Sequence, residues 1–520
     1  MVQPSETALR GKRHMHINFA ETACAGSHMG IGQWKRPGDM TRFKDRLDYY
    51  VWMAKTAERG KVTAIFFADT YGFFDTFMGS PDPQLRAGTH TGQIDPVTIV
   101  GAMAQATKSV GFALTGSTTY LRPFILARTW GSLDHVTDGR IGWNVVTSFG
   151  ETTAKQMGYK EQMSHDERYE AAHEFMDIVY QLWEKCWEDG VQQWSVEPEM
   201  AYDPSKFNKI TFDGKYHQFE GYGQTHPSPQ RTPVLFQAGN STAGIDFAGK
   251  HAEAIYCGSP KIPGLKEYSK KVRAAAVAHG RDPYDIKLFA SMTPIIGRTV
   301  EEAEAKKKEY WENSSWQGGL AHFCGYSGID LSNAPLDEPF DFDGGDLNKA
   351  QIQGFVKAFR TIAGDRSWTP REIGKAFAFG ALVPKPTGTP EMVADMMEEW
   401  FYECDVDGFN LSYFSNPDSF EDIVDLLVPE LQKRGIYWDD YPVPGGTFRE
   451  NMHQVPGEPN IPLRHPGAVH KYNYEELKAK DASKEPTDTA AAGESVASEP
   501  VADAKQNTTE PKVAEITVVA

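Results

Sequence analysis

Eight short apolar segments, each followed by a stretch that can form a helix, restrict the fold of this 520-residue chain more than any other feature. The segments are almost continuously apolar, which is typical of parallel strands covered on both faces. Eight strands that alternate with helices predict an α/β fold, a closed TIM-like (β/α)₈ barrel. The expected strands are residues 14–21, 62–69, 110–120, 140–148, 233–240, 252–259, 286–297 and 406–414.

Two long intervals, residues 188–232 and 305–390, interrupt this alternation and are rich in Gly, Pro, aromatic and acidic residues. Insertions in barrels usually follow strands, so we expect both to cover the mouth of an active site. After residue 475 the chain has almost no aromatic residues, and such a composition cannot offset the entropy cost of ordering. The sequence therefore predicts a disordered leader over 1–11, one barrel over 12–475 and a disordered acidic tail over 476–520.

Charge and composition exclude several classes of function. The formal net charge of −18 opposes binding to nucleic acids or to anionic membranes, which depends on an excess of Lys and Arg. No segment approaches the roughly 18 apolar residues of a membrane span, and the first residues lack the apolar region of a signal peptide. The five cysteines are widely separated and lack metal-ligand spacing. We expect a cytoplasmic protein with reduced thiols, no metal site, and no membrane or nucleic-acid partner.

Polar residues at the carboxyl ends of the predicted strands are candidates for a site, because barrel active sites form at that end. Asp69 ends the second strand, where it can accept a hydrogen bond from a cofactor or cap the following turn. Thr115 lies in the hydroxyl-rich run LTGSTTY, although threonine is also a common strand residue. Asn144 is an amide within an apolar run and needs a partner, either backbone or ligand.

The segment PVLFQAGNSTAG predicts a strand that leads directly into a helix. Ser241 and Thr242 stand where this helix begins, beside free backbone N–H groups. Such a helix start can hold a phosphate through hydrogen bonds and the helix dipole. An ordinary serine N-cap is the alternative explanation.

The common nucleotide, zinc-protease and hydrolase signatures are missing: no GxGxxG follows a strand, and GxxxxGK[ST], HExxH and GxSxG do not occur. Five other motifs occur in order, namely FFADT, LTGSTTY, GRIGWNVVTS, HDERYEAAHEF and QAGNSTAG. Their order and spacing resemble the bacterial-luciferase-like flavin monooxygenases, in the branch of the nitrilotriacetate, dibenzothiophene-sulfone and long-chain-alkane monooxygenases. The resemblance extends from about residue 12 to about residue 470 and includes GTFREN and RHPGA.

This resemblance implies a TIM-like barrel that receives reduced FMN from a separate NAD(P)H:flavin reductase. The enzyme would use O₂ to add one oxygen atom to a small organic substrate, and it would form a homodimer or homotetramer. Six residues match the family's flavin-binding motifs: Asp69, Thr115, Asn144, His165, Tyr169 and Ser241. The first three would lie near the isoalloxazine ring, and Tyr169 and Ser241 at the phosphate. No catalytic acid or base is assigned.

Three other functions are compatible with the same barrel. The chain could be a flavin-binding barrel that has lost catalysis, although nothing in the sequence argues for this directly. A relative could transfer hydride with a deazaflavin instead of activating oxygen. A metal-dependent amidohydrolase is suggested by His14 and His16, but these residues open the first strand, whereas metal ligands should follow its carboxyl end.

Overall fold

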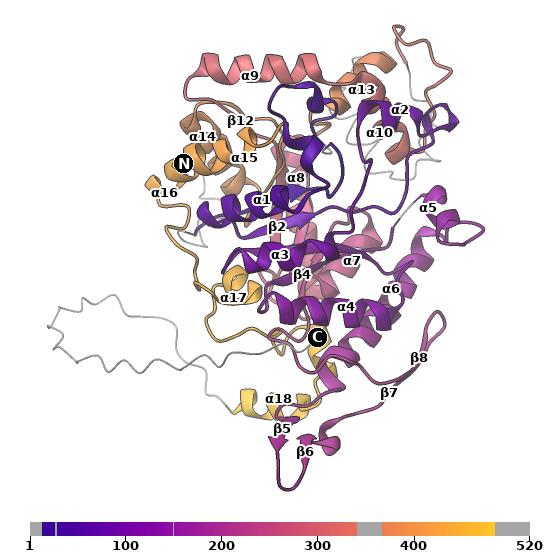
Figure 1. The fold of residues 1–520 in the computed structure, drawn as a ribbon, viewed down its shortest axis with the longest axis vertical. Coiled ribbons are helices and arrows are strands. Elements are labelled where there is room, and N and C mark those ends of the chain that lie inside the picture. The colour runs from indigo at the N-terminus through magenta and orange to yellow at the C-terminus, as the bar shows by residue number, and fades with distance from the viewer. Residues whose placement is uncertain (1–12, 27–28, 149, 341–366, 484–520) are drawn as a thin grey trace, which may run out of the picture. The chain divides into compact units, whose positions relative to one another are not determined.

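Eight parallel strands close into a barrel, as the sequence predicts (Figure 1). This computed structural model describes residues 13–26, 29–148, 150–340 and 367–483. The order around the barrel is β1-β14-β11-β10-β9-β4-β3-β2. Its strands are β1 (His16–Glu21), β2 (Ala64–Phe67), β3 (Gly111–Ser117), β4 (Ile141–Val146), β9 (Val234–Gln237), β10 (Ala254–Cys257), β11 (Lys287–Met292) and β14 (Gly408–Leu411). Each strand lies within one of the eight predicted segments, so the predicted fold class is confirmed.

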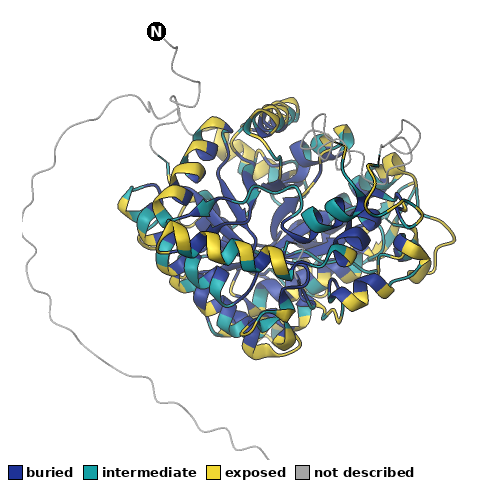
Figure 2. Ribbon diagram, turned by 90° about the horizontal axis from the view of Figure 1, so that it is seen from above, coloured by how far each residue is buried: buried dark blue, intermediate teal, exposed yellow. Residues whose placement is uncertain are grey.

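Alternate residues of each strand contribute to two separate apolar cores. In β2, Ile65 and Phe67 join the large core between the strands and the surrounding helices. Ala64 and Phe66 face the other way and join a smaller core inside the barrel. Figure 2 shows the result: buried strands at the centre, surrounded by helices whose outer faces are exposed. Burial on both faces explains why the strands are almost continuously apolar.

The barrel is surrounded by helices that connect its strands or extend its loops. They are α1 (Leu47–Arg59), α2 (Asp82–Ala87), α3 (Val100–Gln105), α4 (Pro123–Val136), α5 (Glu151–Gln156), α6 (His165–Tyr180), α7 (Thr242–His251), α8 (Ile262–Ala278), α9 (Val300–Asn313), α14 (Pro390–Glu403), α15 (Asp418–Asp422) and α16 (Val428–Lys433). Polar side chains fix several helix starts. Ser164, for example, accepts a hydrogen bond from the backbone N–H of Glu167 at the start of α6.

Helix α17 (Phe448–His453) closes the amino end of the barrel. Phe448 belongs to the interior core and lies against the first residues of β3 and β4. A Cβ atom on Gly111 would lie 2.7 Å from the ring of Phe448, and one on Gly142 would lie 3.0 Å from it. Glycine is therefore needed at both positions for the ring to enter.

The two insertions have different positions. The first contains the hairpins β5 (Gln192–Ser195)–β6 (Met200–Tyr202) and β7 (Ile210–Asp213)–β8 (Gln218–Gly221). It follows helix α6 rather than a strand. His226 contacts His135 at the last turn of α4, and Glu174 of α6 accepts hydrogen bonds from the β7–β8 turn. The expectation that residues 188–232 cover the mouth is therefore wrong; they pack on the outside of α4 and α6.

The second insertion does reach the carboxyl end of the barrel. Its described part includes α10 (Trp316–Ser327), α13 (Pro370–Ala378) and β13 (Thr387–Gly388), which pairs with β12 (Ile295–Ile296) just after β11. Helix α10 packs against α13 and against α2, in the segment that follows β2. The described part of this insertion therefore lies beside the carboxyl end of the barrel. Its role as a cover of the mouth stays a prediction, and residues 341–366 lie outside the described residues.

The chain divides into two units at residue 474. Helix α18 (Tyr474–Ala482) begins at the last residue of the first unit and extends into the segment expected to be disordered, so that expectation is wrong for the first residues of the segment. The rest of the predicted tail, like the predicted leader 1–11, lies outside the described residues.

Candidate functional site

Three of the predicted residues are connected across neighbouring strands. The Thr115 hydroxyl on β3 donates a hydrogen bond to the carbonyl of Phe67, the last residue of β2, at 2.8 Å. The side-chain N–H of Asn144 on β4 donates to the Thr115 oxygen at 2.9 Å. Asp69 follows Phe67 by two residues. The structure thus brings Asp69, Thr115 and Asn144 together at one part of the carboxyl rim.

Asp69 has an environment that disfavours its ionised form. Burial raises its pKa to about 7, and the nearby carboxylate of Asp95 adds to the rise, while a backbone hydrogen bond from Thr70 opposes it. The side-chain amide of Gln93 donates a hydrogen bond to Asp69. A carboxyl group that titrates near neutral pH can either accept or donate a proton, a property common at functional sites.

Two further predicted residues, Ser241 and Tyr169, meet at the start of helix α7, and a third lies beside Tyr169. Ser241 is its N-cap, and its hydroxyl accepts a hydrogen bond from the N–H of Gly244 at 3.0 Å. A Cβ atom on Gly244 would lie 2.8 Å from the Tyr169 hydroxyl and 3.1 Å from the Ser241 hydroxyl. The two hydroxyls therefore flank the same helical turn. His165 lies beside Tyr169, with 5.2 Å between ring centroids, but it is exposed and hydrogen-bonds Asp166.

The group of Asp69, Thr115 and Asn144 lies on the same rim of the barrel as the start of helix α7. Strands β4 and β9 are neighbours, with Asn144 opposite Phe236, and Ser241 follows the end of β9 by four residues. In a parallel barrel all strands end on the same side, which places the ring-side residues and the α7 start around one opening.

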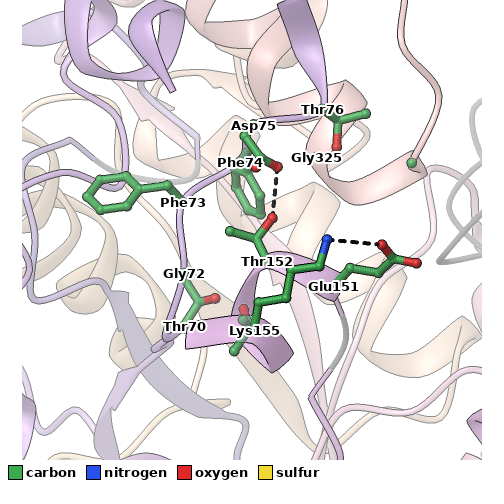
Figure 3. A pocket seen from close by; sticks show the side chains of 13 residues that line it. Thr70, Gly72, Phe73, Phe74, Asp75, Thr76, Glu151, Thr152, Lys155 and Gly325 are labelled. Carbon is green, nitrogen blue, oxygen red and sulfur yellow. Dashed lines mark hydrogen bonds and ion pairs between the residues drawn. The ribbon is translucent and has the colours of Figure 1, made fainter. Parts of the chain in front are cut away.

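A cavity of about 280 Å³ opens at this rim (Figure 3). Thr70, Phe74 and Asp75 approach it from the segment after β2, and Thr152 from helix α5 after β4; the Thr152 hydroxyl donates to Asp75 at 2.8 Å. Gly325 of α10 completes this wall, and its absent side chain makes room for Phe74. None of the six predicted residues lines the cavity, although Asp69 directly precedes Thr70.

Sequence reasoning missed three polar residues inside the barrel. Asn18, Tyr256 and Asn410 are buried, and each has a side-chain atom with no hydrogen-bond partner within the described parts of the chain. A signal was available for two of them, because Asn18 and Asn410 are amides in apolar strands, the pattern that identified Asn144. Nothing in the sequence distinguishes Tyr256 from an ordinary core tyrosine.

A buried network at the end of β1 was also missed. Glu21 and Lys44 form an ion pair at 2.7 Å, with both side chains almost fully buried. The Tyr413 hydroxyl donates to Glu21 at 2.6 Å, and Tyr49 donates to its other oxygen. Lys44 also donates to the carbonyl of Gly26 at 2.9 Å. The network therefore fixes the loop after β1 against the segment after β14.

The histidines that suggested a metal site lie at the opposite end of the barrel. His16 opens β1 and pairs with the Thr63 hydroxyl at 2.9 Å, and burial lowers its pKa to about 3. Within residues 13–483, apart from the gaps noted above, no group of three or more His, Cys, Asp or Glu side chains is arranged to hold a metal ion. Among the described helices, none has the length and apolar character required for a membrane span.

The polar groups at this rim lie where barrel enzymes have their active sites, and the comparisons with known proteins identify the family. Residues 26–407 match the model of the luciferase-like monooxygenases. The chain is 36% identical over 463 residues to the dimethyl-sulfide monooxygenase of Hyphomicrobium sulfonivorans, covering 89% of this chain and 95% of the relative. It is 38% identical over 440 residues to the long-chain alkane monooxygenase of Geobacillus thermodenitrificans, covering 85% and 94%.

Solved structures agree with these relatives. The crystal structure of long-chain alkane monooxygenase superposes with a TM-score of 0.80 at 37% identity, covering 88% of this chain and 99% of that one. A riboflavin lyase, solved with a modified FMN and riboflavin, superposes with a TM-score of 0.79 at 33% identity, covering 88% and 100%. The chain belongs to the luciferase-like monooxygenase family. It is a flavin-dependent monooxygenase, and the predicted family and enzyme class are confirmed.

Proposed function

We propose that this chain is the oxygenase component of a two-component system. It would receive reduced FMN from a separate NAD(P)H:flavin reductase and add one oxygen atom from O₂ to a small organic substrate. Two relatives support the proposal: nitrilotriacetate monooxygenase component A of Aminobacter aminovorans, 30% identical over 450 residues, and the riboflavin lyase solved with a modified FMN. The observation that carries it is the arrangement of two polar groups around one opening of the barrel.

The start of α7 suits the phosphate of FMN. The first N–H groups of a helix are free to bind an anion, and the helix dipole favours negative charge there. The hydroxyls of Tyr169 and Ser241 flank this turn and can donate to phosphate oxygens. His165, at the first turn of α6, is close enough to Tyr169 to approach the same ligand from solvent.

The group formed by Asp69, Thr115 and Asn144, at the ends of β2, β3 and β4, suits the isoalloxazine ring. When bound, reduced flavin supplies the electrons that activate O₂, and the protein must position the ring and exclude water. Asp69 would accept a hydrogen bond from a ring N–H when it is ionised. Thr115 and Asn144, linked to each other and to the end of β2, would fix the adjacent edge.

The cavity next to Asp69 is our candidate for the substrate site. Its volume of about 280 Å³ admits a small molecule, and its wall combines the ring of Phe74 with the hydroxyls of Thr70 and Thr152. Several relatives are named for organosulfur substrates, including dimethyl sulfide and N-acetyl-S-(2-succino)cysteine. Small organosulfur compounds are therefore the first class to screen, with FMN, NADH and a flavin reductase, scored by a mass gain of one oxygen atom.

The substitution Ser241→Asp tests the phosphate site. Aspartate is also a good N-cap, so helix α7 should still form. A second negative charge beside the phosphate should weaken FMN binding at least about tenfold, since like charges a few ångströms apart near a protein surface repel by several kcal/mol. Fluorescence titration with FMN measures the change. Thr299→Asp, at the N-cap of α9, is the matched control and should bind like the wild type.

Unchanged FMN affinity in Ser241→Asp would reject the phosphate assignment. A wild-type protein that binds a deazaflavin but not FMN would favour the hydride-transfer alternative over the oxygenase.

A further inference from the structure

One layer inside the barrel is unusually polar. Phe66, Asn144, Tyr256 and Asn410 come from alternate strands of the barrel order, β2, β4, β10 and β14. Their sequence neighbours, such as Phe409 and Leu411 beside Asn410, belong to the helix-facing core, so these four side chains face the interior. Phe66 and Tyr256, from opposite sides of the barrel, stack with 3.9 Å between ring centroids. Barrel interiors are normally filled by such four-residue layers of apolar side chains.

Three polar atoms of this layer lack a partner. The side-chain oxygens of Asn144, Tyr256 and Asn410 are buried and accept or donate no hydrogen bond within the described residues. Folded proteins rarely leave such atoms unsatisfied, and three in one layer indicate that a group not among the described residues satisfies them.

The layer is open toward the mouth of the barrel. The next inward-facing residues on that side include Ala20, Ala68 and Ser291, which are small and only half-buried. Tyr256 and Asn410 keep 7% and 5% of their surface exposed, whereas Asn18, one inward position below Ala20, has none. A flat ligand lying over the small side chains would therefore contact the exposed parts of Tyr256 and Asn410 but not Asn18, and a rotation of the two side chains would be needed for their buried oxygens to meet it.

The unpaired atoms specify the chemistry of this ligand. An amide oxygen only accepts hydrogen bonds, so the ligand must present N–H or O–H donors to Asn144 and Asn410. The oxidised isoalloxazine ring carries one N–H group, whereas the reduced ring carries a further N–H on its central ring. Acceptors are therefore better matched by reduced flavin.

We propose that Tyr256 and Asn410 contact the isoalloxazine ring from inside the barrel and that Asn410 favours its reduced form. This inference rests on the proposed function, because it requires a flavin at the rim. It assigns the floor of the site to strands β10 and β14, in addition to the residues of β2, β3 and β4.

Anaerobic titration with reduced FMN, and parallel titration with oxidised FMN, tests this assignment. Tyr256→Phe and Asn410→Leu should each raise the Kd for reduced FMN about 5- to 100-fold, the range expected for loss of a buried hydrogen bond. Asn410→Leu should raise the Kd for oxidised FMN less. Because the removed hydroxyl has no partner among the residues that the structure describes, Tyr256→Phe should leave the Tm of the flavin-free protein unchanged or higher.

Tyr437→Phe is the matched control. Its buried hydroxyl donates to the carbonyls of Gly60 and Lys61, so this variant should lose Tm but keep wild-type affinity for both flavins. Wild-type affinity for reduced FMN in both Tyr256→Phe and Asn410→Leu overturns the inference. If the Tm of Tyr256→Phe is then also lower, the partner of the Tyr256 hydroxyl is a buried water molecule. Failure of the wild type to bind reduced FMN would instead overturn the proposed function.

Discussion

The raised pKa of Asp69 should make the free energy of unfolding depend on pH, by an amount that can be calculated from the shift. Burial raises the pKa of Asp69 from 3.8 to about 7, with a further contribution from Asp95. In the folded chain the carboxyl group therefore stays protonated over a pH range in which the unfolded chain has already released the proton. The unfolded state is favoured progressively through this range, so Asp69 makes the protein less stable as pH rises from about 4 to about 7 and has no further effect above that.

The size of this effect follows from the shift. The rise in the pKa of Asp69 can lower the free energy of unfolding by at most roughly 4 kcal/mol, at about 1.4 kcal/mol for each tenfold change in the ionisation equilibrium. Asp69 is partly exposed, and screening by solvent reduces the limit, so we expect about 2–3 kcal/mol. Asp69→Asn replaces the carboxyl group with a neutral side chain of nearly the same shape and should remove this pH dependence.

Urea unfolding at pH 4.5 and pH 8 measures the prediction. The free energy of unfolding of Asp69→Asn should exceed that of the wild type by about 1.5–2.5 kcal/mol more at pH 8 than at pH 4.5, because part of the effect has already occurred at pH 4.5. Asp95→Asn should shift the wild-type transition to lower pH, because it removes the like charge. A stability difference between wild type and Asp69→Asn that does not change with pH would refute the raised pKa and the role of Asp69 as a group that titrates near neutrality.

Two other substitutions test the support of the site. Lys44→Met leaves Glu21 buried without its cation and should lower the free energy of unfolding by about 3–5 kcal/mol, which a lower Tm would show. A double variant with Glu21→Gln should recover the Tm. An unchanged Tm in the single variant would contradict the buried ion pair. Gly319→Ala would place a Cβ atom 1.8 Å from the Gly374 carbonyl and should separate α10 from α13, which limited proteolysis would detect as faster cleavage of the second insertion; wild-type cleavage would argue against this close contact.

The strands could be predicted because their signal is local. Each barrel strand is buried on both faces, so its own residues show a continuous apolar run whatever lies around it. The position of the first insertion could not be predicted in the same way. Residues 188–232 follow a helix, and whether they fold over the mouth or along α4 and α6 depends on contacts such as Glu174 with the β7–β8 turn.

The residues of the candidate site also differ in whether a local sequence signal reveals them. Asp69 and Asn144 stand out in the sequence because a polar residue interrupts or ends an apolar strand. The network around Glu21 gives no such signal, because it joins residues as distant as Tyr413, 392 positions away. His165 shows the limit of motif matching: the motif selects it, but its exposure and its bond to Asp166 also fit an ordinary residue of a first helical turn.

The amino end of the barrel is closed, and this closure helps to exclude water from the floor of the site. Phe448 packs against Gly111 and Gly142 at that end, so we expect a ligand of Tyr256 and Asn410 to enter from the carboxyl mouth. A ring that contacts Tyr256 and Asn410 would enter through the opening flanked by Asp69 and the start of α7, and once there it would cover the polar interior. With the ring in this position, we expect oxygen and substrate to approach it from the side of the cavity, where the second insertion forms part of the wall. Specificity for substrate should therefore depend on the wall formed by α5 and α10, while the flavin is held by the strands beneath it.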